Sequence, residues 1–340
     1  MSEFAPLLRA VAGGESLSAE TMRAAIGALM DESWSAAQAG AFLAALATKG
    51  ETADELVGAA AAMRERSLHV DHALPVVVDT CGTGGDGAGT INISTAVGFV
   101  VASCGIPVAK HGGRAASSKC GSADVLEALG VPIDDGPEAA RRNLERNGFT
   151  FMFAPSYHPA MKVVAPIRRE LGIRTLFNLL GPISNPARAT HQVIGVATDA
   201  HVELIGEALR GLGAQAGAVV HAVSGLDEVA GDGPTQVFQF GRTGVRRYRI
   251  DPAEFGIHAP NAEIAGGDAA TNAAALRAIL AGERSPRADL VALNAGLALV
   301  VAEQAETLSE GLATARRQLA EGAAFAVFER ACRPREEAGR

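Results

Sequence analysis

Apolar side chains recur at intervals of three and four positions through the first 73 residues. The spacing is clearest in three segments, MRAAIGALM (22–30), AAQAGAFLAALATKG (36–50) and ADELVGAAAAMRERS (53–67). Such spacing places the apolar side chains on one face of an α-helix. Two of the predicted helices begin with capping-box spacing, Ser35 with Gln38 and Thr52 with Glu55, in which side chains bond to free backbone N–H groups. We therefore expect residues 1–73 to form a small helical domain.

From residue 74 on, the pattern changes to short apolar runs that alternate with helical stretches. The runs read VVVDT (76–80), GIPVAK (105–110), FTFMFA (149–154), HQVIGVAT (191–198) and AGAVVHAV (216–223). Strands separated by helices form parallel sheets that are covered on both faces. We therefore expect an α/β domain over residues 74–340, with a mostly parallel central sheet flanked by helices. A helical pattern returns between two predicted strands, and we expect helices within residues 160–185 to join the N-terminal helical domain.

Charge and composition narrow the range of partners. The 340 residues are 48% hydrophobic, enough for a large core, and carry a formal net charge of −8. An acidic chain does not favour nucleic acid or an anionic membrane face, since both need a basic footprint. The four cysteines lack the paired spacing of a zinc site, and the apolar stretch 97–104 is too short to cross a bilayer. No secretory signal is recognisable, so we expect a cytoplasmic protein without a nucleic-acid or membrane partner.

A glycine-rich loop follows the first predicted strand and leads into a helix that begins near Ser94. The segment reads DTCGTGGDGAGTINISTA (79–96), and backbone N–H groups at such a helix start bind anions. Its glycines fit the dinucleotide pattern G-x-G-x-x-G, but that fold needs an acid about 20 residues further on. Here the next predicted strand ends in Lys110, and no G-K-[ST] follows the loop. Neither a dinucleotide site nor a nucleoside-triphosphate loop is therefore expected.

Two further segments follow strand ends and complement this loop. The second loop, KHGGRAASSKCGSAD (110–124), supplies cations and hydroxyl groups, whereas the first supplies backbone amides and hydroxyl groups. The segment SGLDEVAGDG (224–233) places Asp227 and Glu228 after another predicted strand. Carboxylate oxygens suit Mg²⁺, which keeps water or phosphate as its other ligands. Because strand ends of a parallel sheet meet at one edge, the three segments predict a site for a phosphorylated sugar with magnesium.

Eight motifs in this order resemble those of the anthranilate phosphoribosyltransferase family. They are GTGGD (82–86), NIST (92–95), KHGGRAASS (110–118), GSADVLEALG (121–130), HPAMK (158–162), PIRRELGIRT (166–175), NLLGPISNP (178–186) and GLDE (225–228). The resemblance implies the nucleoside phosphorylase/phosphoribosyltransferase fold, in a homodimer whose helical domain is hinged to the α/β domain. It also implies transfer of the phosphoribosyl group of phosphoribosyl pyrophosphate to the amine of anthranilate, with Mg²⁺, in tryptophan biosynthesis.

The resemblance also assigns roles to individual residues. Phosphoribosyl pyrophosphate would be bound by Gly82, Gly85, Asp86, Thr90, Asn92, Ile93, Ser94, Thr95, Lys110, Ser117, Ser118 and Ser122. Magnesium would be held by Ser94, Asp227 and Glu228, and anthranilate by Gly82, His111, Gly113 and Arg168. Lys110, Asp227 and Glu228 would be the catalytic residues. One departure concerns the acceptor, because the family usually has asparagine at the position of Gly113.

Other interpretations of the same residues remain. A pyrimidine nucleoside phosphorylase shares the fold, but the segment KHGGR does not supply its lysine–serine–arginine pattern. A non-catalytic relative that binds nucleic acid would have basic helices and would lack the glycine loop or the carboxylate pair. Individually, His111 and His158 are more typical of hydrogen-bonded structural histidines, and adjacent acids such as Asp227 and Glu228 more often lie in a solvated loop.

Overall fold

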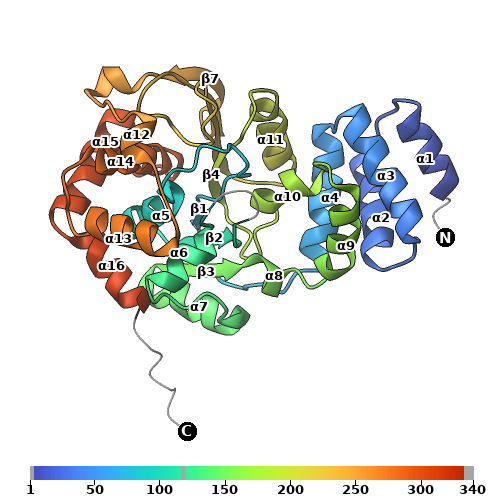
Figure 1. Ribbon diagram of the computed structural model, residues 1–340, viewed down its shortest axis with the longest axis horizontal. Helices are drawn as coiled ribbons and strands as arrows, with labels where there is room; N and C mark the ends of the chain where they lie inside the picture. The colour runs from blue at the N-terminus through green and yellow to red at the C-terminus, as the bar shows by residue number, and fades with distance from the viewer. Residues whose placement is uncertain (1–3, 116–118, 333–340) are drawn as a thin grey trace, which may run out of the picture.

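The computed structural model describes residues 4–115 and 119–332. It consists of an N-terminal group of helices and a larger α/β part built on one sheet, as expected from the sequence (Figure 1). No helix within the described residues is both long and apolar enough to cross a membrane.

The N-terminal helices are α1 (Phe4–Ala12), α2 (Ala19–Met30), α3 (Ala36–Lys49) and α4 (Ala53–Glu65). Both predicted capping boxes are confirmed. The Ser35 hydroxyl accepts from the Gln38 backbone N–H at 3.2 Å, and the Gln38 side chain accepts from the Ser35 backbone N–H at 2.9 Å. Thr52 and Glu55 make the equivalent pair at the start of α4. These bonds satisfy backbone donors that a helix start otherwise leaves open.

Two later helices pack against this group. They are α9 (Met161–Leu171), which contacts α2 and α3, and α10 (Phe177–Ile183), which contacts α4. Val164 and Leu180, from these two segments, are fully buried in the same apolar cluster as Phe42 and Leu56. In Figure 1, α9 lies beside the blue N-terminal helices although it is far from them in sequence. This packing supports the proposal that helices within residues 160–185 belong to the helical domain.

The sheet has seven strands in the order β3-β2-β1-β4-β5-β6-β7. Their bounds are β1 (Val78–Asp79), β2 (Val108–Gly112), β3 (Phe149–Phe153), β4 (His191–Gly195), β5 (Ala216–Ala222), β6 (Thr235–Gly241) and β7 (Gly244–Ile250). The first five pair in parallel, and each overlaps a predicted strand, although β2 continues two residues past the predicted end at Lys110. The antiparallel hairpin β6–β7 adds two strands that the sequence analysis did not predict.

Helices cover both faces of the sheet. The remaining ones are α5 (Ile93–Ser103), α6 (Ser122–Ala128), α7 (Gly136–Asn147), α8 (Ala154–Tyr157), α11 (Ala200–Gly211), α12 (Asn261–Ile264), α13 (Ala269–Leu280), α14 (Pro286–Val301), α15 (Leu308–Ala320), α16 (Ala323–Cys332) and a 3₁₀ turn (Pro252–Phe255). Val193 of β4 belongs to the cluster of α5 and α14, whereas its neighbour Ile194 belongs to the cluster of the N-terminal helices. This alternation is what a strand buried on both faces requires.

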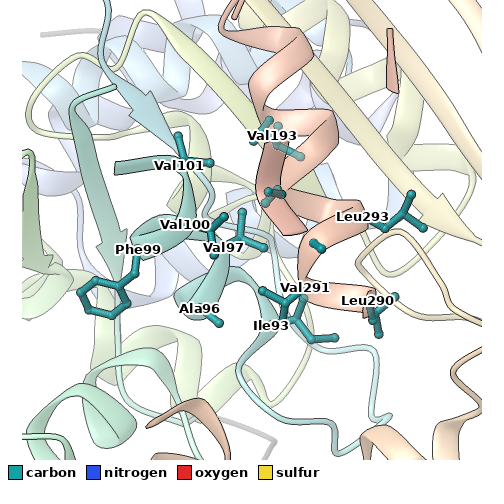
Figure 2. Packing of buried hydrophobic residues seen from close by; sticks show 14 of the residues in the cluster. Ile93, Ala96, Val97, Phe99, Val100, Val101, Val193, Leu290, Val291 and Leu293 are labelled. Carbon is teal, nitrogen blue, oxygen red and sulfur yellow. The ribbon is translucent and has the colours of Figure 1, made fainter. Parts of the chain in front are cut away.

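The start of α5 is fixed by core packing. Figure 2 shows Ile93 and Val97 of α5 in one apolar cluster with Val291 of α14. All three side chains are at most 2% exposed. The first turn of α5 is therefore anchored where the glycine-rich loop ends.

Candidate active site

A pocket of about 600 Å³ opens at the carboxyl ends of the parallel strands. The chain reaches β2 and β3 on one side of β1, and β4 and β5 on the other. Such a change in strand order leaves a crevice where ligands bind in open α/β sheets. The predicted site residues that line the pocket are Gly82, Gly85, Asp86, Thr90, Asn92, Ile93, Ser94, Thr95, Lys110, His111, Gly113, Ser122, Asp227 and Glu228. Ser117 and Ser118 lie outside the described residues.

The glycine-rich loop between β1 and α5 is held by backbone contacts from other segments. The Thr83 N–H donates to the carbonyl of Gly195 at 2.8 Å, and the Gly266 N–H donates to the carbonyl of Gly89 at 2.8 Å. A Cβ at Gly82 would lie 3.0 Å from the Gly195 carbonyl oxygen and 3.2 Å from a carboxylate oxygen of Asp227. Glycine at position 82 therefore lets the loop approach β4 and the carboxylate segment.

Lys110 supplies the cation that the glycine-rich loop lacks. Its side chain extends from β2 and is 1% exposed. The ammonium group donates to the backbone carbonyl of Thr80 at 3.2 Å and lies 3.4 Å from the Thr80 hydroxyl and 3.3 Å from the Ser94 hydroxyl. The charge is thus fixed beneath the start of α5, on the floor of the pocket.

A buried carboxylate, that of Asp79, supports this region. Asp79 is fully buried and accepts from the side-chain amide of Asn185 at 2.7 Å and from the His111 backbone N–H at 3.3 Å. Burial raises its pKa to about 6, although the charge of Lys110 opposes the shift. Asp79 therefore connects β1 to β2 at the residue that follows Lys110, and the two charges interact.

Acids gather on the other side of Ser94, the residue that also contacts Lys110. The carboxylate of Glu228 accepts from the Ser94 backbone N–H at 3.2 Å, at the start of α5. Burial, together with repulsion from Asp86, raises the pKa of Asp227 to about 7. Burial and the neighbouring Asp227 raise that of Glu228 to about 8. Such shifts mean that these carboxylates repel one another when no cation lies between them.

The acids stand close to β4 because of a second glycine. A Cβ at Gly195 would overlap the backbone carbonyl of Asp227, so only glycine allows the carboxylate segment to pack here. Among the described residues, no group of three or more His, Cys, Asp or Glu side chains is arranged to hold a metal ion alone. A divalent cation at this corner would therefore need oxygens from a ligand or from water, as Mg²⁺ commonly does.

His111 and His158 form a buried neutral pair. His111 Nδ1 donates to the carbonyl of Gly181 at 3.0 Å, which leaves its Nε2 as an acceptor for His158 Nε2 at 3.2 Å. Burial lowers the pKa of His111 to about 4 and that of His158 to about 3. This geometry favours the structural interpretation of both histidines. The anthranilate contact of His111 stays a prediction.

The second loop (110–124) is held by hydrogen bonds to the carboxylate of Asp124. Asp124 accepts from the backbone N–H groups of Ala115 and Gly121, both at 2.9 Å. Arg114 contacts Asp124 and Glu127, each at 2.9 Å, so part of the positive charge expected from this loop is already paired. Of the cations that the sequence analysis assigned to this loop, Lys110 is the one that lies deepest in the pocket.

The arginines of the α9–α10 segment differ from expectation. Arg168 does not line the pocket and instead lies over the ring of Phe177, 5.8 Å from its centre. Its contact with anthranilate remains a prediction. Arg174 and Asn178 do line the pocket, and neither was predicted. Arg174 reaches Gly85, where an added Cβ would lie 2.9 Å from the guanidinium and where φ is +84°. Both residues lie inside quoted motifs, so the motifs held a signal for them.

Comparisons with known proteins match both parts of the chain. Residues 5–67 match the helical bundle domain of a glycosyl transferase family, and residues 74–325 match the α/β domain of such a family. Anthranilate phosphoribosyltransferase of Desulfatibacillum aliphaticivorans is 46% identical over 96% of this chain and 97% of its own. That of Rubrobacter xylanophilus is 48% identical over 98% of both chains.

Solved structures agree with these relatives. The crystal structure of anthranilate phosphoribosyltransferase from Thermus thermophilus superposes with a TM-score of 0.91 at 43% identity, over 96% of this chain and 98% of that one. The enzyme from Saccharomyces cerevisiae, in complex with phosphoribosyl pyrophosphate and Mg, gives a TM-score of 0.88 at 27% identity, over 96% of both chains. This chain belongs to the anthranilate phosphoribosyltransferase family.

Proposed function

We propose that the protein transfers the phosphoribosyl group of phosphoribosyl pyrophosphate to the amine of anthranilate, in tryptophan biosynthesis. The products are N-(5-phosphoribosyl)anthranilate and pyrophosphate. The names of the relatives support this assignment. The observation that carries it is the meeting of the glycine-rich loop, a buried lysine and the acids of the β5 segment in one pocket.

The phosphorylated sugar would lie along the glycine-rich loop. Backbone N–H groups of the loop and the hydroxyls of Thr90, Ser94 and Thr95 would donate to phosphate oxygens, since they line the pocket at the start of α5. Lys110 faces the same wall, and its ammonium would neutralise charge that develops on the departing diphosphate. Asp86 would face the sugar hydroxyls, and Gly82, Gly85, Asn92, Ile93 and Ser122 complete the lining. Ser117 and Ser118 remain in the proposal through the family resemblance alone.

The acidic side fits a magnesium ion. Asp227 and Glu228 offer hard oxygen ligands, and the backbone N–H of Ser94, the third predicted ligand, bonds to Glu228. The raised pKa values of both acids reflect burial and mutual repulsion, which a cation would offset. When bound, Mg²⁺ would supply charge neutralisation for the diphosphate. The yeast relative was solved with phosphoribosyl pyrophosphate and Mg, which supports the same pairing here.

The reaction would proceed by displacement at the anomeric carbon. The amine nitrogen of anthranilate forms a bond to this carbon as the carbon–oxygen bond to pyrophosphate breaks, and the electron pair leaves with the pyrophosphate oxygen. The secondary ammonium formed in this way then loses one proton, to water or to a nearby carboxylate, and becomes the secondary amine of the product. Alignment of two bound reactants contributes about 7–11 kcal/mol in favourable cases, so positioning supplies much of the acceleration.

The acceptor side of the proposal rests on fewer groups. Anthranilate would enter beside Gly82, His111 and Gly113, with Arg168 as the partner of its carboxylate. A Cβ at Gly113 would meet no atom of the described residues within 4 Å, so these residues leave space there for the asparagine that is usual in the family. We expect anthranilate to bind more weakly than it does to family members with that asparagine.

Two further parts of the proposal concern the assembly and the compartment. We propose a homodimer, supported by family membership, with light scattering of the purified protein as its test. We also propose a cytoplasmic location, where the four free cysteines would stay reduced.

The direct test follows the loss of anthranilate fluorescence after addition of phosphoribosyl pyrophosphate and Mg²⁺. We expect loss of the signal with both additions and none when the metal is chelated. Release of ribose-1-phosphate from thymidine or uridine with phosphate, in place of anthranilate turnover, would instead identify a nucleoside phosphorylase. Absence of both reactions would reject the proposed function.

A further inference from the structure

Asn272 lies outside the pocket but is bonded to a residue that lines it. It is the fourth residue of α13, and its side chain is 1% exposed. Its side-chain Nδ2 donates to the side-chain Oδ1 of Asn92 at 2.8 Å. Asn92 precedes α5 and lines the pocket at the end of the glycine-rich loop. A helix remote from the pocket thus contacts the binding wall through one amide.

The orientation of both amides follows from the two ends of a hydrogen-bonded chain. At one end the Gly267 backbone N–H, which can only donate, is 2.8 Å from Asn272 Oδ1. At the other end the backbone carbonyl of Cys120, which can only accept, is 3.1 Å from Asn92 Nδ2. Each amide between them must therefore present oxygen toward Gly267 and nitrogen toward Cys120. Reversing either amide would place two donors or two acceptors against each other.

The hydrogen bonds of Asn92 keep its side chain from capping the start of α5. Asparagine in front of a helix commonly accepts a backbone N–H of the first turn with its own side chain. Asn92 makes no such bond, because its oxygen is taken by Asn272, and the backbone carbonyl of Asn92 accepts from Thr95 N–H at 3.1 Å instead. Its Nδ2 carries two hydrogens and uses one on Cys120. Within the described residues the second hydrogen has no acceptor, and it belongs to a residue that lines the pocket.

We propose that Asn272 is a positioning residue, which holds the Asn92 amide so that an N–H, and not its oxygen, is presented to the anionic sugar phosphate. This inference rests on the proposed function. It assigns to α13 a part in donor-substrate binding, although α13 contributes no atom to the pocket. The same hydrogen bonds join three segments of the pocket wall. They are the segment of Gly266 and Gly267, which contacts Gly89, the end of the glycine-rich loop at Asn92, and the second loop at Cys120.

Two substitutions break the chain in different ways. Asn272→Leu keeps a similar volume and removes the bonds to Gly267 and Asn92 together with the side-chain bond to Cys120, so Asn92 is free to rotate. Asn272→Asp keeps the shape, but a carboxylate accepts from Gly267 and cannot donate to Asn92, so the Asn92 amide is expected to turn its nitrogen toward residue 272. In both variants we expect the KM for phosphoribosyl pyrophosphate to rise about tenfold, the size of one lost hydrogen bond to a charged group. The KM for anthranilate should stay within twofold.

The experiment combines these variants with Asn92→Ala in a double-mutant cycle. If Asn272 acts through Asn92, Asn272→Leu will raise the KM for phosphoribosyl pyrophosphate by less than twofold in the Asn92→Ala background. Leu276→Ala is the matched control, since Leu276 is a fully buried α13 residue outside the chain of bonds. It should lower Tm and leave that KM within twofold.

Each other outcome overturns the inference. Independent effects in the cycle, an equal rise of both KM values, a rise in Leu276→Ala as large as that in Asn272→Leu, or unchanged KM values would each contradict it. If Asn272→Leu fails to fold, Asn272→Asp gives the same comparison. A wild-type protein without phosphoribosyl transfer rejects the proposed function itself, whereas an active wild type with an uncoupled cycle rejects only the role of Asn272.

Discussion

The two walls of the pocket are built on opposite electrostatic principles. On one wall the ammonium of Lys110 is surrounded by the carbonyl of Thr80 and the hydroxyls of Thr80 and Ser94, and it interacts with the charge of Asp79. On the other wall Asp227 and Glu228 are buried beside Asp86, and burial and repulsion raise their pKa values. On the first wall the ammonium of Lys110 has hydrogen-bond partners within the protein itself. On the second wall, burial and repulsion disfavour the charged forms of both carboxylates, and a bound cation would offset this.

The largest effect is expected at the acidic wall. Asp227→Ala and Glu228→Ala should each lower Mg²⁺-dependent turnover by about 10³-fold or more, because each removes a charged oxygen ligand. Steady-state rates across a magnesium titration check this. Asp232→Ala, an exposed acid five residues from Asp227, is the control and should keep its rate. Full turnover and unchanged metal dependence in both variants would show that the metal lies elsewhere.

A smaller loss is expected at the lysine wall. Lys110→Met keeps most of the side-chain length and removes the charge, and kcat should fall about 10²-fold because the leaving diphosphate loses one electrostatic partner. The exposed Lys162→Met, outside the pocket, serves as the control. If kcat were unchanged while only KM rose, Lys110 would bind the substrate equally in the ground state and the transition state.

The buried histidine pair and the buried carboxylates should respond to pH in opposite directions, and Asp79, whose pKa burial raises to about 6, belongs with the carboxylates although it lies at the lysine wall. His111 and His158, next to the lysine wall, have folded-state pKa values below the ordinary 6.5. Their neutral forms therefore contribute stability above pH 6.5, which is lost as the pH falls toward 4, by up to about 1.4 kcal/mol per pH unit for each group. Asp227 and Glu228 have raised pKa values, so without metal they reduce stability as the pH rises from about 4 toward 8.

Thermal unfolding across this pH range, with and without Mg²⁺, separates the two effects. The acid-side loss should not depend on the metal, whereas the loss near pH 8 should be reversed by it. Substitution of the exposed His258 by Gln should leave the acid-side slope unchanged. A slope at low pH that persists in a His111→Gln, His158→Gln double variant would assign the acid sensitivity to other groups.

The smallest effect is expected at Gly113, a pocket residue beside which anthranilate is proposed to bind. Gly113→Asn should lower the KM for anthranilate by up to about tenfold, because a side-chain amide can add one hydrogen bond in open space. The KM for phosphoribosyl pyrophosphate should not change. Titration of anthranilate in the two proteins measures this, and an unchanged or raised KM would show that position 113 does not face the acceptor.

Much of this architecture was predictable because its signals are local. The apolar spacing before residue 73, the five strand runs and the capping boxes all depend on neighbouring residues. The loop after β1 and the Asp227–Glu228 pair were likewise identified because each follows a strand run. Lys110 was predicted to end its strand, but it is the middle residue of β2. The rule that such ends meet at one sheet edge then predicted one pocket.

The remainder depends on contacts between distant segments. The hairpin β6–β7 extends the sheet with antiparallel pairs, and the expectation of alternating strands and helices did not include it. Arg174 reaches Gly85 only because α9 and α10 pack beside the helical domain. Asn272 is separated from Asn92 by 180 positions, and no spacing rule connects two asparagines across that interval. The charge of Arg114 is diverted by Asp124 and Glu127, which the sequence analysis did not pair with it.

A crystal structure of the protein with phosphoribosyl pyrophosphate and Mg²⁺ tests the central claim most directly. The account predicts the diphosphate between the glycine-rich loop and the lysine wall, with one metal ion joining its oxygens to Asp227 or Glu228. A diphosphate bound in another crevice, or a metal ion with no ligand from the acidic wall, would contradict it.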